Sequence, residues 1–141
     1  MENNVSDPFV DTDILIRLLS ADDPIKQAAS ADLFEKVQKG KLTLRAPVTV
    51  IADAVYVLSS PKLYNLTRVQ VRDLLSSLIK IPNFKVDNKQ ALLKALDLYA
   101  TRNLDFGDAF LISLARQTKA KIIYSYDRDF DKISGISRKE P

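Results

Sequence analysis

The sequence predicts an α/β protein with three α/β/α layers, in which helices cover both faces of a mainly parallel central sheet. Three observations support this class. Short β-branched or aromatic runs alternate with amphipathic helical patterns, no repeat or low-complexity tract interrupts them, and 141 residues, 46% of them hydrophobic, can bury one core. We therefore expect a single domain over residues 1–141, with its core at about 8–136 and a loose tail at 137–141.

The N-terminal third predicts one strand and two helices. Residues 8–11 have the pattern of a short buried strand, and helical spacing follows directly over residues 12–20. Asp23 before Pro24 is a typical helix start, because a capping carboxylate precedes a proline in the first turn. Gly40 is expected to end this second helix. Its predicted buried stripe consists of Ile25, Ala29, Leu33 and Val37.

The middle of the chain predicts two short strands and three helices. Alternation at residues 42–45 favours a strand, and the proline that follows can open a helix over residues 47–58. Thr67 is a suitable cap for the next helix. A strand at residues 84–86 then leads to a helix over about 88–102. The apolar row of the helix after Thr67 consists of Val71, Leu74, Leu75 and Leu78.

The C-terminal part predicts a helix, a strand and an acidic turn. In the helix expected over residues 105–118, Asp108 shares a row with Ile112, so its side chain should face the protein. Residues 121–125 are β-branched and aromatic, which favours a strand, and residues 126–130 are turn-like. The solvent-facing side of the helix is expected to carry Ser113, Arg116 and Gln117.

The composition narrows the possible chemistry. The sequence contains neither cysteine nor histidine, which excludes disulfides, thiolate zinc sites and a Ser-His-Asp triad. Any metal must therefore be held by oxygen, which favours Mg²⁺ or Mn²⁺. The net charge of +3 suits a phosphate-bearing partner but is also common without one. With no basic segment before an apolar run at the start, and no apolar run near the roughly 18 residues of a membrane span, we expect a soluble cytoplasmic protein.

Four acidic residues stand at the ends of predicted elements. Asp11 and Asp127 follow strands, whereas Asp53 and Asp108 lie near the starts of helices. Because the carboxyl ends of parallel strands form the ligand crevice of such sheets, one edge could gather all four. A carboxylate against an apolar core is costly unless a cation meets it, so this convergence would indicate a metal site.

The same acids belong to four ordered motifs that extend over about residues 10–136. The motifs are FVDTDILIRLL at 9–19, the helix at 48–58, DFGDA at 105–109 and YSYDRDF at 124–130. Together they resemble the PIN-domain ribonucleases, especially the VapC-type toxins of toxin–antitoxin pairs. Two positions depart from that pattern. Asp13 stands where asparagine is more frequent, and Asp53 stands where glutamate is usual, so its shorter arm requires a helix shift, a bridging water or weaker metal binding.

The resemblance implies a metal-dependent endoribonuclease that leaves 5′-phosphate and 3′-hydroxyl ends. One or two Mg²⁺ or Mn²⁺ ions would be held by Asp11, Asp108 and Asp127, with Asp53 as the fourth catalytic acid. The supporting residues would be Thr12, Asp105 and Ser125. Candidate contacts to the RNA backbone are Arg17, Arg45 and Arg116. The resemblance also implies a homodimer and a small antitoxin protein as partner.

Several of these acidic residues also have a purely structural explanation. Asp105 can simply cap its helix, with Asp108 as its partner in the first turn. Asp13 precedes Arg17 by four residues, which favours an exposed ion pair over a ligand role. Asp53 lies at the border of an apolar stripe and can pair with a basic residue. A hydrated loop explains the charged residues of the last turn, which are Arg128, Asp129, Asp131 and Lys132.

Two other functions remain open. One is a PIN-like module that binds RNA or protein without cutting, its metal pocket weakened by Asp53. The other is a haloacid-dehalogenase-type phosphatase, because an Asp11-Thr-Asp13 segment after a strand also resembles the opening of that family. This second reading requires Asp13 to face the site, and the chain is short for such a fold. The apolar stripes at residues 25–37 and 69–81 are candidate interfaces, although core packing explains them more simply.

Overall fold

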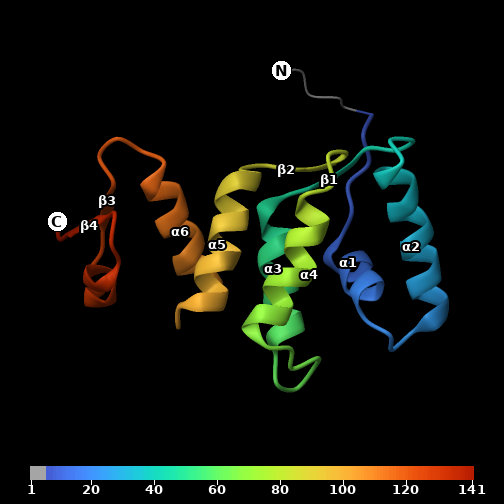
Figure 1. The fold of residues 1–141 in the computed structure, drawn as a ribbon, viewed down its shortest axis with the longest axis horizontal. Helices are drawn as coiled ribbons and strands as arrows, with labels where there is room; N and C mark the ends of the chain where they lie inside the picture. Colours follow the sequence, from blue (N-terminus) through green and yellow to red (C-terminus); the bar gives the residue numbers. More distant parts are fainter. Residues whose placement is uncertain (1–5) are drawn as a thin grey trace. The chain divides into compact units, whose positions relative to one another are not determined.

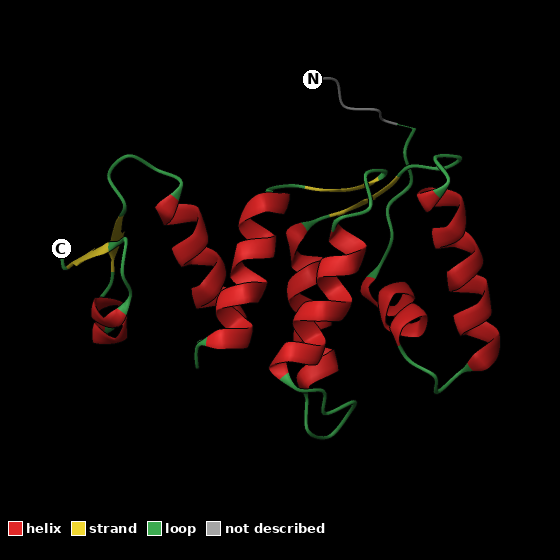
Figure 2. Cartoon of the chain, in the orientation of Figure 1, coloured by secondary structure: helices red, strands yellow, loops and turns green. Residues whose placement is uncertain are grey.

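The computed structural model describes residues 6–141, so the first five residues of the predicted domain lie outside it. In the described chain, pairs of α-helices precede each of the first three short strands, and every strand pair is parallel (Figures 1 and 2). This confirms the expected α/β class with parallel strands. The chain divides into two compact units, Met1–Lys89 and Gln90–Pro141, which are described separately. The single-domain organisation stays a prediction.

Over its described residues, 6–89, the first unit has short parallel strands and the helices α1 to α4. β1 lies parallel to β2, with Leu44 opposite Phe84 (Figure 1). α1 contacts both α2 and α3, and α4 contacts α3 and β2. The elements are α1 (Thr12–Leu19), α2 (Pro24–Gln38), β1 (Leu44–Ala46), α3 (Val48–Ser59), α4 (Arg68–Ile79) and β2 (Phe84–Val86).

The segment before α1 is less regular than expected. Instead of a strand over residues 8–11, a single parallel bridge joins Phe9 to Arg45, and the Val10 N–H donates to the Arg45 carbonyl at 2.9 Å. Pro8 has no N–H to extend the ladder, which limits the pairing. Val10 is buried, but Phe9 is 70% exposed, so only one residue of this segment joins the core.

Local signals placed the helix starts correctly. The Asp23 side chain accepts from the Lys26 N–H at 3.0 Å, and Thr67 forms a capping box with Gln70. The helix that starts at Asp23 ends before Gly40, whose φ of 77° is the left-handed conformation typical of a helix end. The predicted core row of α4 is also confirmed, except that Leu74 is only partly buried.

The predicted buried stripe of α2 is wrong in its first half. Ile25 is 84% exposed and Ala29 is exposed, whereas Ser30 and Phe34 are buried together with Val37. The ring of Phe34 packs edge-on against Phe84, with centroids 5.5 Å apart. Because an aromatic pair buries more apolar surface than an isoleucine, it determines the face that α2 turns inward.

The second unit contains most of α5, whose first residue belongs to the first unit. β3 and β4 are parallel, with Ile122 opposite Ser137. One core cluster of this unit consists of buried apolar side chains from α6, β3, the 3₁₀ helix η1 and the residue that follows η1. The elements are α5 (Lys89–Thr101), α6 (Phe106–Arg116), β3 (Ile122–Tyr124), η1 (Arg128–Lys132) and β4 (Ser137–Lys139). The cluster is Ile112, Ala115, Ile123, Phe130 and Ile133.

Two sequence-based expectations in this unit are wrong. The tail expected to be loose contains β4, which pairs with β3 and is held by ion pairs from Arg138 to Asp131 and Glu140. Ser113, expected to face solvent, is only 2% exposed. Its hydroxyl donates to the Ala109 carbonyl at 2.9 Å, so a small polar side chain is satisfied within its own helix.

Among residues 6–141, no helix has the length and apolarity needed to cross a bilayer.

Candidate functional site

Asp11 stands at the start of α1, as the sequence predicted. Its backbone is extended, with φ −90° and ψ 164°, and its carboxylate accepts from the Thr12 N–H at 2.7 Å. Two backbone bonds fix the chain immediately before it: the Val10 N–H donates to the Arg45 carbonyl, and the Arg45 N–H donates to the Pro8 carbonyl. A helix N-terminus carries a partial positive charge, which stabilises this exposed carboxylate. Thr12 therefore supports Asp11 through its backbone N–H.

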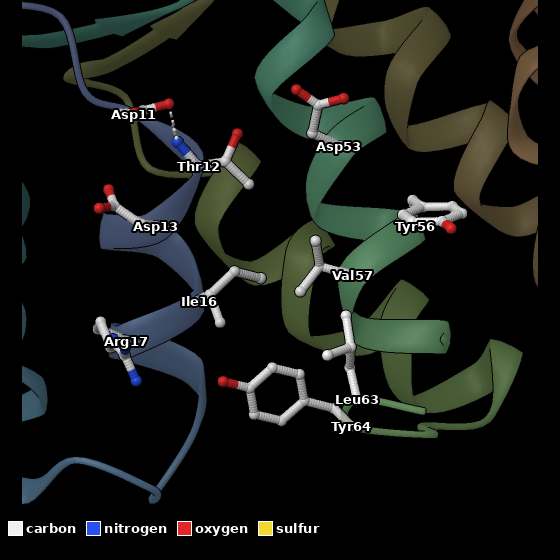
Figure 3. A pocket seen from close by; sticks show the side chains of 10 residues that line it. All are labelled: Asp11, Thr12, Asp13, Ile16, Arg17, Asp53, Tyr56, Val57, Leu63 and Tyr64. Carbon is white, nitrogen blue, oxygen red and sulfur yellow. Dashed lines mark hydrogen bonds between the residues drawn. The ribbon is translucent and has the colours of Figure 1, made fainter. Parts of the chain in front are cut away.

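Asp11 and Asp53 line the same cleft in the first unit, a cavity of about 560 Å³ (Figure 3). Asp53 is exposed on α3, although its neighbours Ile51 and Ala54 are fully buried, so it occupies the predicted border of the apolar face. Within residues 6–141, Asp53 has no hydrogen bond or ion pair. The expected pairing with a basic residue is therefore absent from the described chain, and the carboxylate is available to a ligand in the cleft.

Asp13 also lines this cleft, and its predicted ion pair with Arg17 is wrong. Arg17 instead contacts Asp22, with Nη1 3.2 Å from the carboxylate. Asp22 also accepts from the Ser20 hydroxyl at 2.8 Å and from the Tyr64 hydroxyl at 2.6 Å. The hydrogen bond from Tyr64 is the main reason that the pKa of Asp22 is lowered. Asp22 thus accepts from Arg17, Ser20 and Tyr64, and Arg17 pairs with Asp22 instead of Asp13. This arrangement was not predicted from the sequence.

Asp105 and Asp108 open α6 in the second unit. The Asp105 carboxylate accepts from the Asp108 N–H at 2.8 Å, so the capping explanation of Asp105 is confirmed. The Asp108 side chain is half-buried, as its row with Ile112 predicted. Burial raises the pKa of Asp108, and the charges of Asp105, Asp127 and Asp129 raise it further. The environment of Asp108 therefore disfavours its ionised form.

Asp127 follows β3 and is fixed by its neighbours. Its N–H donates to the Ser125 hydroxyl at 3.0 Å, and its carboxylate accepts from the Asp129 N–H at 2.9 Å. Arg138 donates to the Ser125 carbonyl at 3.0 Å and pairs with Asp131 at 2.9 Å. The Ser125 hydroxyl thus contacts the backbone of Asp127, and its supporting role in the site stays a prediction. The contacts of Arg138 were not predicted, because its strand has no apolar pattern.

The two remaining arginines proposed as RNA contacts have structural partners. Arg45 pairs with Asp7 at 3.2 Å. Arg116 donates twice to the Ser134 carbonyl, at 2.6 Å from Nη2 and 3.2 Å from Nε. The turn charges are exposed as expected, with Asp129 3.5 Å from Lys132. Contact between these arginines and RNA stays a prediction.

The donor set suits a hard divalent cation in its chemistry. The candidate ligands are carboxylates, and a nearby cation would offset the burial and the neighbouring negative charges that raise the pKa of Asp108. Within neither unit does the described chain gather three or more acidic side chains in a metal-binding group. The ligand set of Asp11, Asp108 and Asp127, and the sharing of one site by all four acids, therefore stay predictions.

Comparison with known proteins identifies the family. The sequence model of the PIN domain matches residues 9–136, which includes all four motifs. PIN domains are generally nucleases, which hydrolyse phosphodiester bonds. A search of curated proteins gave no match. Because the family match extends over most of the sequence, the chain belongs to the PIN domain family.

Proposed function

We propose that the protein is a metal-dependent endoribonuclease and the cytoplasmic toxin of a toxin–antitoxin pair. Its family makes nuclease activity the general expectation. The observation that supports metal dependence most strongly is the environment of Asp108. Burial and the charges of Asp105, Asp127 and Asp129 all raise the pKa of Asp108, so its anion is unfavourable, and carboxyl groups perturbed in this way are typical of functional sites.

The proposal assigns a divalent cation, Mg²⁺ or Mn²⁺, to Asp11, Asp108 and Asp127. When bound, such a cation supplies Lewis acidity that lowers the pKa of water and offsets charge on the phosphate. Ser125 holds the turn that carries Asp127, with its hydroxyl accepting from the Asp127 N–H at 3.0 Å. The Thr12 N–H orients Asp11 by donating to its carboxylate at 2.7 Å. With no histidine in the sequence, none of these steps involves imidazole as a base.

Asp53 is proposed as the fourth catalytic acid. Its side chain is exposed in the cleft that Asp11 also lines, and within residues 6–141 it has no competing partner. The Asp53 side chain is one methylene shorter than the glutamate usual at this position in the PIN family. It would therefore bind the metal directly only if the metal lies close to α3, and otherwise through a bridging water.

RNA cleavage by purified protein tests this proposal. Labelled structured RNAs are incubated with Mn²⁺, with and without EDTA, beside Asp108→Asn and the control Asp32→Asn. Asp32 is exposed on α2 and outside the cleft with Asp11 and Asp53, so its variant controls for loss of one negative charge. We expect cutting only with metal, lost in Asp108→Asn and kept in the control. Cutting that persists both in EDTA and in Asp108→Asn would point to a contaminating nuclease, whereas RNA left uncut by the wild-type protein with Mn²⁺ would contradict the proposal.

The alternative of a binding module without activity predicts a different outcome in the same experiment. That module would bind RNA without cutting it, because of the short Asp53 arm. The phosphatase reading is not proposed. Asp13 does line the cleft beside Asp11, as that reading requires, but the family match accounts for the whole segment in which both acids stand.

The proposed partners are an antitoxin protein and a second copy of the chain. Two large apolar side chains from the predicted stripes remain in contact with solvent, Ile25 at 84% and Val69 at 46% exposure. Exposed apolar side chains of this kind are candidates for an interface. Light scattering coupled to size-exclusion chromatography tests the homodimer, with a monomer at micromolar concentration as the contrary result.

A further inference from the structure

Arg138 has an almost buried guanidinium on a strand of polar side chains. Its side chain is only 12% exposed, and β4, which consists of Ser-Arg-Lys, pairs with β3 and contacts η1 (Figure 1). Burying a charge costs free energy unless hydrogen bonds and opposite charges replace the water. Pairing with β3 uses only backbone groups, so it does not require an arginine at this position. The reason for the arginine must lie in what its guanidinium contacts.

The guanidinium holds both ends of the segment 125–131. Nη1 donates to the Ser125 carbonyl at 3.0 Å, whereas Nε and Nη2 donate to the two carboxylate oxygens of Asp131 at 2.9 and 3.3 Å. A planar guanidinium that binds both oxygens of a carboxylate fixes its direction as well as its distance. In addition, the Ser125 N–H donates to the Lys139 carbonyl at 3.0 Å. One side chain of β4 therefore closes this segment into a loop.

Asp127 lies inside the closed segment. Its N–H donates to the Ser125 hydroxyl at 3.0 Å, and one of its carboxylate oxygens accepts from the Asp129 N–H at 2.9 Å. Within residues 6–141, no hydrogen bond or ion pair occupies its other oxygen. Phe130 is 5% exposed and belongs to the core cluster, so it anchors the later part of the segment. The backbone of Asp127 is thus fixed on both sides, while one carboxylate oxygen is open to a ligand.

Arg138 acts on Asp127 through other groups, because no direct contact joins the two side chains. In metal sites, the partners that orient the ligands affect metal affinity strongly, since a displaced ligand binds the metal less well. Arg138 has the contacts of such a partner, with Ser125 and Asp131 as its two points of attachment. Its third partner, Glu140, lies outside the segment, 2.7 Å from Nη1.

We propose that Arg138 is a positioning residue, which fixes the segment 125–131 so that the Asp127 carboxylate is oriented toward a divalent cation. This inference rests on the proposed function, in which Asp127 is a metal ligand. It adds to the four acids a residue from β4 that lies outside all four motifs, because the last motif ends at residue 130. In this role Arg138 contacts neither the metal nor RNA.

Charge and position predict opposite effects on metal affinity when the guanidinium is removed. Arg138→Met keeps the apolar stem of the side chain and leaves Asp131 and Glu140 without their cation. The uncompensated negative charge would by itself attract a divalent cation and tighten its binding. Loss of the hold on Asp127 would weaken that binding, so the sign of the change separates the two effects. Lys121→Met is the matched control, because it also removes a cation and two hydrogen bonds to backbone carbonyls in the same unit.

Two measurements test the proposal. Calorimetric titration with Mn²⁺ gives the metal affinity, and NMR hydrogen exchange of the metal-free protein reports how firmly the turn is held. We expect Arg138→Met to bind Mn²⁺ about tenfold more weakly than wild type, at the lower end of the range for partners of metal ligands. Exchange of the Asp127 and Asp129 amides should be faster in the same variant. Arg138→Lys keeps the charge without the planar fork and should lie between, whereas Lys121→Met should match wild type.

Circular dichroism verifies that each variant is folded, and Arg138→Lys carries the comparison if Arg138→Met is not. Unchanged or tighter Mn²⁺ binding by Arg138→Met would overturn the proposal, as would unchanged exchange of the two amides. An equal loss of affinity in Lys121→Met would also overturn it, because the effect would then be general destabilisation. No Mn²⁺ uptake by the wild-type protein would contradict the proposed function, whereas faster exchange in Arg138→Met alone would still support the hold on Asp127.

Discussion

Replacement of Asp105 separates its two effects at the start of α6. Asp105→Ala removes the helix cap, whereas Asp105→Ser keeps a capping oxygen and removes only the charge. The capping bond, 2.8 Å to the Asp108 N–H, satisfies an amide that has no partner within the helix. Loss of such a cap costs about 1 kcal/mol. The same charge contributes to the raised pKa of Asp108, where it ranks after burial.

The expected magnitudes follow from these contacts. Asp105→Ala should lower the free energy of unfolding by about 1 kcal/mol, or roughly 3–5 °C in Tm for a chain of this size. Asp105→Ser should lose at most a few tenths of that, because serine is an equally good cap. In both variants the pKa of Asp108 should fall, because one of the neighbouring negative charges is gone.

Urea unfolding gives the stabilities, and NMR titration of the Asp108 carboxyl gives its pKa. Manganese titration of Asp105→Ser adds a functional measurement, since a residue that only caps the helix should leave metal affinity nearly unchanged. Equal destabilisation by the two variants would refute the capping argument. An unchanged pKa of Asp108 in both variants would refute the electrostatic argument.

The remaining predictions concern the neighbouring acids and Arg138. Folding raises the pKa of Asp108 above its value of about 3.8 in the unfolded chain, so ionised Asp108 destabilises the fold at pH values above 3.8. Asp108→Asn should therefore raise Tm at pH 7, and the gain should vanish by about pH 3. Calorimetry showing no gain at pH 7 would contradict this. Asp53→Glu should tighten Mn²⁺ binding and speed RNA cutting, and slower cutting would show that α3 is adapted to the shorter arm. Arg138→Ala should slow RNA cutting several-fold, because it removes the 3.0 Å hydrogen bond to the Ser125 carbonyl, two residues before Asp127. The rate of Arg138→Lys should lie between those of wild type and Arg138→Ala. Unchanged rates in both variants would contradict a positioning role.

Features that depend on neighbouring residues were predictable from the sequence. The caps at Asp23, Thr67 and Asp105 form bonds within three residues, so the residue types alone indicate them. The positions of Asp11 and Asp127, after short extended segments, follow from the same local alternation of strands and helices. Membership in the PIN domain family, expected from four motifs, is confirmed by the match to residues 9–136.

Features that depend on distant pairing were not predictable. β4 consists of Ser-Arg-Lys, which has no apolar alternation, and it forms only because β3 offers a parallel partner. The bond between Asp22 and Tyr64 joins residues 42 positions apart, so no local pattern indicates it. The exposure of Ile25 likewise depends on a contact between Phe34 and another element. The shared metal site of the four acids remains a prediction from motif order and carboxylate chemistry.

Calorimetric titration with Mn²⁺ tests the central claim most directly, because it measures metal uptake without knowledge of the target RNA. Wild-type protein and Asp32→Asn should show the same saturable uptake, and Asp108→Asn should bind at least about tenfold more weakly, as expected when a ligand carboxylate is removed. No uptake by the wild-type protein, or equal affinity in Asp108→Asn, would contradict the assignment of these carboxylates to a divalent cation.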